Sequence, residues 1–265
     1  MLEPLPTLRA PLKPEDALAR NLPARVALDC LAAGWRDFRR NPLASLAYGL
    51  LLFLLSVGVI WALHRFGLLY LALPALAGFM ILGPFLAIGL YQKSRALAGG
   101  EGAHLADMRH SRAAAGAQLA YAGLLLCLLL LFWLRAADLL YALFFGLQPF
   151  PGAGEAVVNT FTTLRGWMLL LTGGFVGALF AGFAFAVSVY AIPMLVSEPR
   201  DALTAFGLSF AMVTRNPGPS LAWGAIVTLG IAFSILTGLL GLIVVFPVLG
   251  HGTWHLFRAV RGGGA

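Results

Sequence analysis

The stretch Ala27–Gly49 (ALDCLAAGWRDFRRNPLASLAYG) returns later in the chain as Ala202–Gly224 (ALTAFGLSFAMVTRNPGPSLAWG). The two segments lie 175 positions apart and are identical at nine positions, including the runs Arg-Asn-Pro and Ser-Leu-Ala. In each copy a helix-like stretch is followed by an Asn-Pro pair and then by the start of a long apolar run. An internal repeat fixes the architecture before any single residue does. This repeat predicts a surface helix that turns a corner into a membrane more than once.

Composition places the chain in a lipid bilayer. Of its 265 residues, 60% are hydrophobic and only 11% are charged, whereas about a quarter of the residues in a soluble domain are charged. A membrane-spanning helix needs about 20 apolar residues. Four runs of sufficient length lie near residues 43–63, 67–92, 113–134 and 167–195.

The last apolar stretch, from Pro219 to Val260, is too long for a single span. As one helix, its about 40 residues would extend roughly 60 Å, which is twice the thickness of the hydrocarbon core. We therefore expect it to fold back at the glycine-containing segment 237–241, which gives six spans in total. Because this turn carries no charge, the sequence leaves open whether the stretch forms two spans or one broken helix.

The distribution of basic residues sets the orientation. With six spans, 15 of the 18 Lys and Arg residues lie on the side of the N terminus, and only Arg65, Arg135 and Arg165 lie opposite. Basic loops mark the cytoplasmic side. We expect a multi-pass membrane protein with both termini in the cytoplasm. The net charge of +7 reflects this asymmetry and an attraction to anionic lipid headgroups, and we expect no nucleic-acid partner.

The two repeated segments predict interfacial helices. In residues 23–40, apolar residues recur at intervals of three and four, and arginines fall on the other face, as in helices that lie along a membrane surface. Proline disfavours helical geometry in the residue before it, so each Asn-Pro pair should end its helix. The repeat corners are expected at Asn41, Pro42, Asn216 and Pro217. The residues expected to bind lipid headgroups or a partner are Arg25, Trp35, Arg36, Phe38, Arg39, Arg40, Arg200 and Arg215.

Together these patterns predict an all-α polytopic membrane protein. Its six transmembrane helices form three repeats of an interfacial helix plus a transmembrane hairpin, at about residues 23–92, 93–195 and 196–260. Residues 1–22 are expected to be a disordered or extended cytoplasmic N terminus. Residues 23–260 are expected to be a single membrane domain, and residues 261–265 a flexible tail. The middle repeat lacks the Asn-Pro pair.

Two kinds of chemistry can be weighed against a purely structural role. His251 and His255 lie four residues apart on one helix face, and paired imidazoles at this spacing could ligate a metal or approach a haem. Ion-coupled carriers place ionisable residues at membrane depth, and we expect none in the cores of the six spans. Arg135 and Asp138, at the edge of the third span, are expected to pair locally. A passive route for a small apolar or lipid substrate stays open.

Three segments in the C-terminal part resemble a family of bacterial integral membrane proteins. They are Asn216–Pro219, Thr237–Gly241 and Pro247–His255, and the family is called domain of unknown function 2189. The resemblance covers about residues 25–260 and is strongest in the last 70. It implies a six-span inner-membrane protein and carries no activity.

The chain contains no phosphate-binding loop and no recognisable nucleophile or metalloprotease motif, so we expect neither an enzyme nor a cofactor. The function that fits best is a non-catalytic membrane interaction, assembly or membrane-organising protein. Its partners would be the bilayer, anionic headgroups, and a membrane-protein partner or a second copy of the chain. The alternatives are a passive transporter or channel for a small apolar or lipid substrate, and a haem- or metal-binding respiratory accessory subunit.

Overall fold

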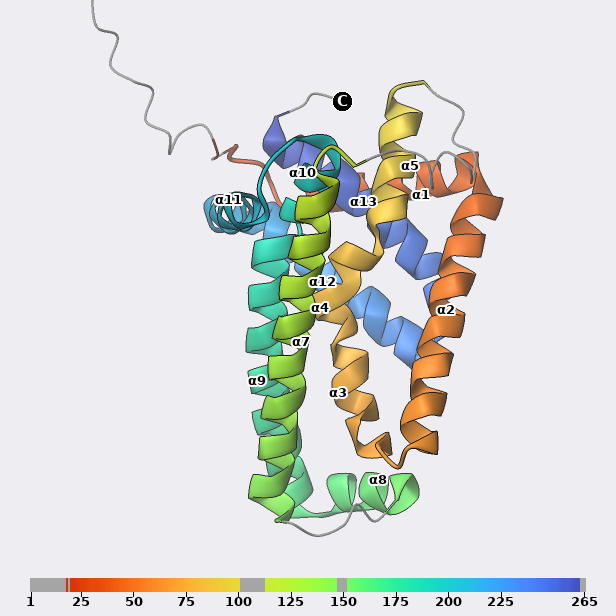
Figure 1. Ribbon diagram of the computed structural model, residues 1–265, viewed down its shortest axis with the longest axis vertical. Coiled ribbons are helices and arrows are strands. Elements are labelled where there is room, and N and C mark those ends of the chain that lie inside the picture. Colours follow the sequence, from red (N-terminus) through yellow and green to blue (C-terminus); the bar gives the residue numbers. More distant parts are fainter. Residues whose placement is uncertain (1–17, 19, 101–112, 147–151, 263–265) are drawn as a thin grey trace, which may run out of the picture.

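The computed structural model describes residues 18, 20–100, 113–146 and 152–262. Of these residues 85% are helical and none forms a strand, which confirms the all-α class. Most of the predicted N-terminal segment, residues 101–112 of the predicted middle repeat and residues 263–265 of the predicted tail lie outside the described ranges. The helices run mainly along one axis as a bundle (Figure 1).

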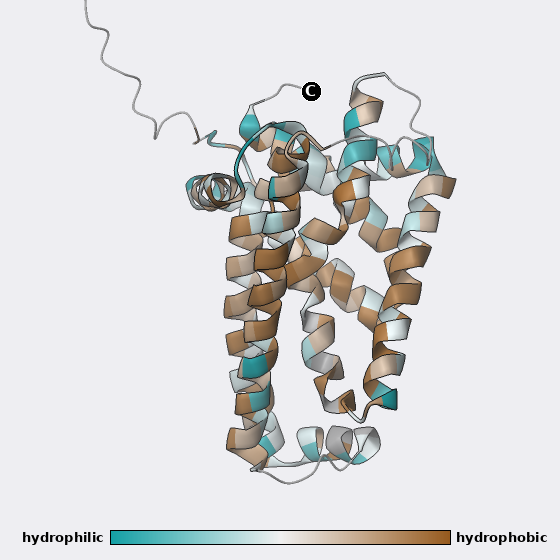
Figure 2. Ribbon diagram, in the orientation of Figure 1, coloured by the Kyte–Doolittle hydropathy of each residue, from teal (hydrophilic) through white to brown (hydrophobic). Residues whose placement is uncertain are grey.

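Five segments are long and apolar enough to cross a membrane. They are Pro42–Arg65, Pro74–Ala98, Gly116–Phe145, Leu164–Ser197 and Pro217–Leu236. Only 28% to 44% of the most apolar part of each segment is buried inside the protein, so most of its side chains face outward, as expected where lipid tails are the solvent. The long helices are hydrophobic along most of their length, and hydrophilic residues gather at one end of the bundle (Figure 2).

Two of these segments are interrupted helices. The second comprises α3 (Ala72–Ala77), α4 (Phe79–Leu86) and α5 (Ile88–Ala98), preceded by the 3-10 turn η1 (Leu69–Leu71). Proline removes a backbone donor and clashes with the preceding turn, and Pro74 and Pro84 both lie in this segment.

The fourth segment divides into α9 (Leu164–Ser188) and α10 (Ala191–Ser197). A buried hydroxyl bridges this break. Ser209 Oγ accepts a hydrogen bond from the backbone nitrogen of Tyr190 (3.2 Å) and donates one to the carbonyl of Ala186 (2.8 Å). The backbone groups freed by the break are therefore satisfied inside the protein.

Surface helices lie across both ends of the bundle (Figure 1). At one end, here called the α1 end, lie α1 (Val26–Arg40) and α11 (Ala202–Arg215). At the other, the α8 end, lies α8 (Ala153–Thr162). The predicted helix–corner–span arrangement is therefore present at both Asn-Pro pairs.

The two corners share a backbone conformation but use the asparagine differently. Asn41 caps α2 (Pro42–Arg65), and its Oδ1 accepts from the backbone nitrogen of Ala44 (3.4 Å). Asn216 precedes α12 (Pro217–Leu236), and its Oδ1 accepts from the backbone nitrogen of Arg20 (2.9 Å). The second corner therefore holds the segment that leads into α1.

The last apolar stretch folds back where the sequence predicts. The chain turns over residues 237–241, with positive φ angles at Gly238 and Leu239, and continues as α13 (Leu242–Arg261). A side chain at Gly49 of α2 would collide with the backbone of Ile243. Gly49 is only seven residues past Pro42, or about 10 Å along α2. The start of α13 therefore lies in the first third of α2, well short of the α8 end. Helix α13 is not one of the five candidate spans, and the six-span count is not confirmed.

Helix α7 (Gly116–Phe145) packs chiefly against α9, whereas α13 packs most extensively against α1. Close approach of α1 and α13 depends on small residues. A Cβ atom on Gly34 would lie 2.5 Å from the carbonyl oxygen of Val248 and 2.6 Å from the backbone nitrogen of Gly252. Ala27, Cys30 and Ala33 extend the same buried face of α1. This contact places α13 directly beneath the surface helix.

Candidate functional site

A buried group of polar side chains lies at the α1 end, where four helices meet. These helices are α1, α2, α5 and α13. The residues, here called the polar network, are Asp37, Ser45, Lys93, Ser94, His251 and His255. All of them except His255 are buried. Ionisable groups in such a position are uncommon and mark a functional-site candidate.

Lys93 occupies the corner between α1 and α2. Its side chain is 1% exposed, and Nζ donates to the carbonyl oxygen of Asn41 (2.7 Å) and to Oγ of Ser45 (2.6 Å). An ammonium group has only donors, and a carbonyl together with a hydroxyl oxygen supplies the acceptors that it needs. The buried charge is thereby hydrogen-bonded at the point where the chain enters its first span.

His251 uses both ring nitrogens and is fully buried. Nε2 lies 3.0 Å from Oγ of Ser45, and Nδ1 lies 2.8 Å from Oγ of Ser94. Ser45 already accepts from Lys93, so its own hydrogen is available to Nε2. Nδ1 then carries the ring proton and donates it to Ser94. The hydrogen bonds therefore run in one direction through a neutral imidazole.

The network ends at a carboxylate. Nε2 of His255 donates to Oδ2 of Asp37 at 2.8 Å, and the two side chains are 29% and 7% exposed. Burial by itself would raise the pKa of Asp37, but hydrogen bonds from His255 and Ser94 hold that pKa below its usual range. Asp37 is therefore a carboxylate that accepts from both sides.

The ring nitrogens of the two histidines predicted as a metal pair are hydrogen-bonded in the structure. His251 and His255 do belong to one cluster, but the nitrogens of His251 are taken by two serines and Nε2 of His255 by Asp37. Within the ranges that the structure describes, no three His, Cys, Asp or Glu side chains could hold a metal ion. The geometry leaves no open coordination position on His251.

Reasoning from sequence missed four members of the network: Asp37, Ser45, Lys93 and Ser94. The span that contains Lys93 extends further than the sequence predicts, because the segment Pro74–Ala98 runs past residue 92 and includes the buried Lys93 near its α1 end. Lys93 was counted with the following basic loop, but α5 continues through Ala98. The signal that could have found it is the polar run of residues 92–94 within a continuing helix.

The expected lipid- or partner-binding residues divide into two groups. Arg36, Arg39 and Arg40 on α1 are exposed, as is Arg25 directly before it, and Trp35 is 45% exposed. Phe38, in contrast, is only 7% exposed; it stacks on Trp35 (5.3 Å between ring centroids) and faces the bundle. The apolar residues of α1 are therefore shared between α13 and the outer surface, and Phe38 is not available to lipid.

On α11 and the segment before it, the two expected arginines are half-buried. Arg200 pairs with Glu198 at 2.7 Å, so its charge is partly committed within the protein. The expected local ion pair is confirmed: Arg135 contacts Asp138 at 3.1 Å.

A helical bundle whose long, apolar helices face outward is an integral membrane protein. Residues 71–197 match the family model of domain of unknown function 2189, described as a predicted integral membrane protein. This match confirms the resemblance found in the sequence over residues 71–197, which span α3 to α10. The match ends before the C-terminal segments that suggested the family. Comparisons with curated proteins and with solved structures gave no match.

Proposed function

We propose that the protein is a non-catalytic membrane-organising or assembly protein of a bacterial inner membrane. In this proposal the α1 end faces the cytoplasm and binds anionic lipid headgroups. The observation that supports it most strongly is the position of α1 and α11, which lie across the same end of the bundle (Figure 1). The distribution of Lys and Arg along the sequence favours the same end as the cytoplasmic one.

The outer face of α1 combines charge with apolar surface. Arg36, Arg39 and Arg40 are exposed, and Leu28 (61% exposed) and Trp35 (45% exposed) lie on the same helix. Basic residues near an anionic membrane surface contribute about 1 kcal/mol each to binding, and tryptophan favours the interface. The buried face of α1 keeps this surface fixed to the spans, so lipids would meet a rigid platform.

We further propose that the chain is built from three repeats of a surface helix and a hairpin. Two observations support this: α1 enters α2, and α11 enters α12, through the same Asn-Pro corner. In the last repeat the hairpin would enter the membrane through α12 and return through α13 before reaching the far side, which keeps both termini at the α1 end. Arg20 and Arg261, near the two termini, are hydrogen-bonded there (3.1 Å).

The polar network favours a second candidate, a transporter. Lys93, Asp37 and His251 are the kinds of groups that carriers use at membrane depth. As described, however, the network joins only α1, α2, α5 and α13 at the α1 end. A route across the membrane would have to continue from it, so a membrane-organising role is the better-supported proposal.

The test compares lipid selectivity of the full chain in vesicles of phosphatidylcholine and phosphatidylglycerol. Spin-labelled lipids report the motionally restricted fraction around the protein. We expect phosphatidylglycerol to be preferred, and the preference to fall in a triple variant Arg36→Gln, Arg39→Gln, Arg40→Gln.

The matched control is Arg65→Gln, Arg135→Gln, Arg165→Gln, which removes three charges outside α1 and should leave the preference unchanged. Equal loss in both triple variants, or no preference in the wild-type protein, would contradict the proposal. Solute flux through the same vesicles would favour the transporter, and a Soret absorbance band would favour the haem-binding alternative.

A further inference from the structure

A cavity of about 350 Å³ opens at the α1 end, where α5, α10 and α13 all terminate. Three arginines line it against a single glutamate: Arg95, Arg258 and Arg261 against Glu198. Trp254 and Phe257 form an apolar wall. The cavity thus combines positive charge with a surface suited to carbon groups, and it is separate from the polar network.

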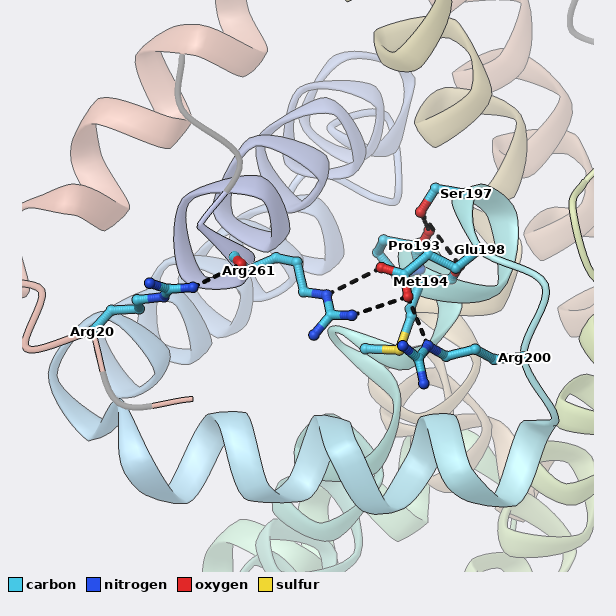
Figure 3. A network of polar contacts seen from close by, with 7 residues as sticks. All are labelled: Arg20, Pro193, Met194, Ser197, Glu198, Arg200 and Arg261. Carbon is cyan, nitrogen blue, oxygen red and sulfur yellow. Dashed lines mark hydrogen bonds and ion pairs between the residues drawn. The ribbon is translucent and has the colours of Figure 1, made fainter. Parts of the chain in front are cut away.

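The one carboxylate of the cavity is already neutralised. Arg261 binds Glu198 through two contacts, Nε to Oε1 and Nη2 to Oε2, both at 3.1 Å. Arg200 adds a third contact, Nε to Oε2 at 2.7 Å (Figure 3). Burial alone would raise the pKa of Glu198, but hydrogen bonds and charge from the two arginines lower it. Glu198 therefore has little capacity to repel or to bind a further group.

Arg95 has unused donors. Its Nη1 donates to the carbonyl oxygen of Val196 (2.8 Å), and it makes no ion pair with any residue in the described part of the chain. A guanidinium carries five N–H donors in a planar fork, so one carbonyl leaves most of them available. Such a fork fits carboxylate and phosphate oxygens in a bidentate manner.

Trp254 contributes an unsatisfied donor. The side chain is 4% exposed, and its Nε1 is one of two buried side-chain polar atoms that have no partner among the residues placed in the structure. Leaving a buried donor unpaired costs about 1–3 kcal/mol. Native proteins pair such groups, and because this N–H has almost no accessible surface, an acceptor in the cavity reaches it only when the ring turns toward the cavity.

We infer that this cavity binds a phosphate group. The fork of Arg95 supplies donors, and the indole N–H of Trp254 adds one when the ring turns toward the ligand. Arg258 and Arg261 supply positive charge, and the ring of Phe257 packs against the carbon part of the ligand. The phosphate belongs either to an anionic phospholipid headgroup or to a soluble phosphate monoester. This site does not use the α1 arginines, so it can be tested independently of the proposed lipid platform.

The experiment measures binding to the purified full chain in detergent by native mass spectrometry. The three probes are short-chain phosphatidylglycerol, the diacylglycerol of the same chain length, and glycerol phosphate. We expect phosphatidylglycerol to bind and diacylglycerol to bind at least about tenfold more weakly. If glycerol phosphate alone reproduces the binding, the source is a soluble monoester; if it does not bind, the source is a lipid headgroup.

Two variants locate the site: Arg95→Gln and Trp254→Phe. Each should weaken phosphate binding by about tenfold, the loss expected for one charged hydrogen bond. The matched controls are Arg165→Gln, at the start of α9, and Trp35→Phe, which alters an exposed indole on α1; both should bind as the wild type does. If Arg95→Gln lowers the thermal stability, Trp254→Phe becomes the deciding variant for phosphate binding, because it keeps an aromatic ring and removes the N–H donor.

Equal binding of phosphatidylglycerol and diacylglycerol would overturn the inference. So would Arg95→Gln and Trp254→Phe variants that bind like their controls. In either case the arginines serve only to offset the negative partial charge at the carbonyl ends of α5, α10 and α13.

Discussion

Lys93 and His251 share the hydroxyl group of Ser45. Nζ of Lys93 lies 2.6 Å from the oxygen and Nε2 of His251 lies 3.0 Å from it. A hydroxyl group donates one hydrogen bond and accepts two. Because Ser45 accepts from the ammonium group of Lys93, its own hydrogen is donated to the imidazole of His251. One side chain in the first turn of α2 thereby ties α5 to α13. The charge of Lys93, the tautomer of His251 and the packing of α2 against α5 and α13 therefore depend on one another.

We expect Lys93 and Asp37 to be energetically coupled although they are not in contact. Removing one member of a buried charged cluster leaves the other uncompensated and costs about 3–5 kcal/mol. Lys93→Met and Asp37→Asn should each lower the unfolding free energy in detergent, and the double variant should lose clearly less than the sum. Denaturant titration of the four proteins gives the coupling energy.

The control cycle is Arg135→Gln with Asp138→Asn, an ion pair whose arginine side chain is 81% exposed. Exposed pairs contribute about 0–1 kcal/mol, so this cycle should show little coupling. If the losses of unfolding free energy caused by Lys93→Met and Asp37→Asn add to within about 0.5 kcal/mol, the two charged residues are not coupled through the network.

The direction of the hydrogen bonds predicts the tautomer of His251. Lys93 can only donate and the Asp37 carboxylate can only accept, so the ring proton should sit on Nδ1. We expect nitrogen-15 chemical shifts typical of a neutral Nδ1–H imidazole, assigned by comparison with His251→Gln. The signal of exposed His64 serves as the internal reference. In Ser94→Ala the Nδ1 proton loses its acceptor, and the His251 signals should shift most. A neutral Nε2–H form in the wild type would refute this assignment.

The features that follow from local rules could be predicted from the sequence. The Asn-Pro corners depend on the geometry of proline and its neighbour, and both formed as expected. That the last apolar stretch folds back followed from its length, because one helix of that length would exceed the bilayer, and the glycines of residues 237–241 indicated where it turns. The apolar composition likewise predicted a bundle of membrane helices, and the positions of the basic residues predicted that its two ends differ in charge.

The sequence could not predict the features that depend on tertiary contacts, which are the burial of Phe38 and Lys93 and the depth of α13. The apolar spacing of α1 shows that one face is hydrophobic but not whether lipid or protein covers it. The structure places α13 under that face, which buries Phe38. Lys93 is hidden for the same reason: a lysine at the end of an apolar run suggests a loop until Ser45 and Asn41 are seen beside it. The depth of α13 depends on its contact with Gly49, which is likewise a tertiary contact.

Gly34 should control the contact between α1 and α13. A Cβ atom at this position meets backbone atoms, which cannot move aside as a flexible side chain can. We expect Gly34→Leu to separate the helices and expose Cys30, which is 5% exposed and whose pKa is raised to about 11 by burial and by the charge of Asp29. In a Cys127→Ser background, maleimide labelling at neutral pH should be slow in the parent protein and at least about tenfold faster in the variant.

Gly58→Leu provides the control for Gly34→Leu, because no neighbouring atom lies within 4 Å of a Cβ added at Gly58. Labelling of Cys30 should stay slow in this variant. Fast labelling of the parent protein would show that α1 detaches without any substitution, and the proposed rigid platform would then lose its support.

Glu198 should make the stability of the α1 end depend on pH. Its pKa is lowered from the ordinary value of 4.5 despite burial, because Arg200 and Arg261 bind the charged form. A lowered pKa in the folded state contributes stability that is present above the pKa of the unfolded chain and is lost as pH falls through the folded value. Thermal unfolding midpoints should therefore separate wild type from Glu198→Gln near neutral pH, and the difference should shrink as the pH falls below about 4.

The control is Glu155→Gln, which replaces an exposed glutamate and should give no such difference. A gap between wild type and Glu198→Gln that is equally large at low pH would show that the side chain acts through its neutral hydrogen bonds, and that the charge balance inferred for the phosphate cavity is incorrect.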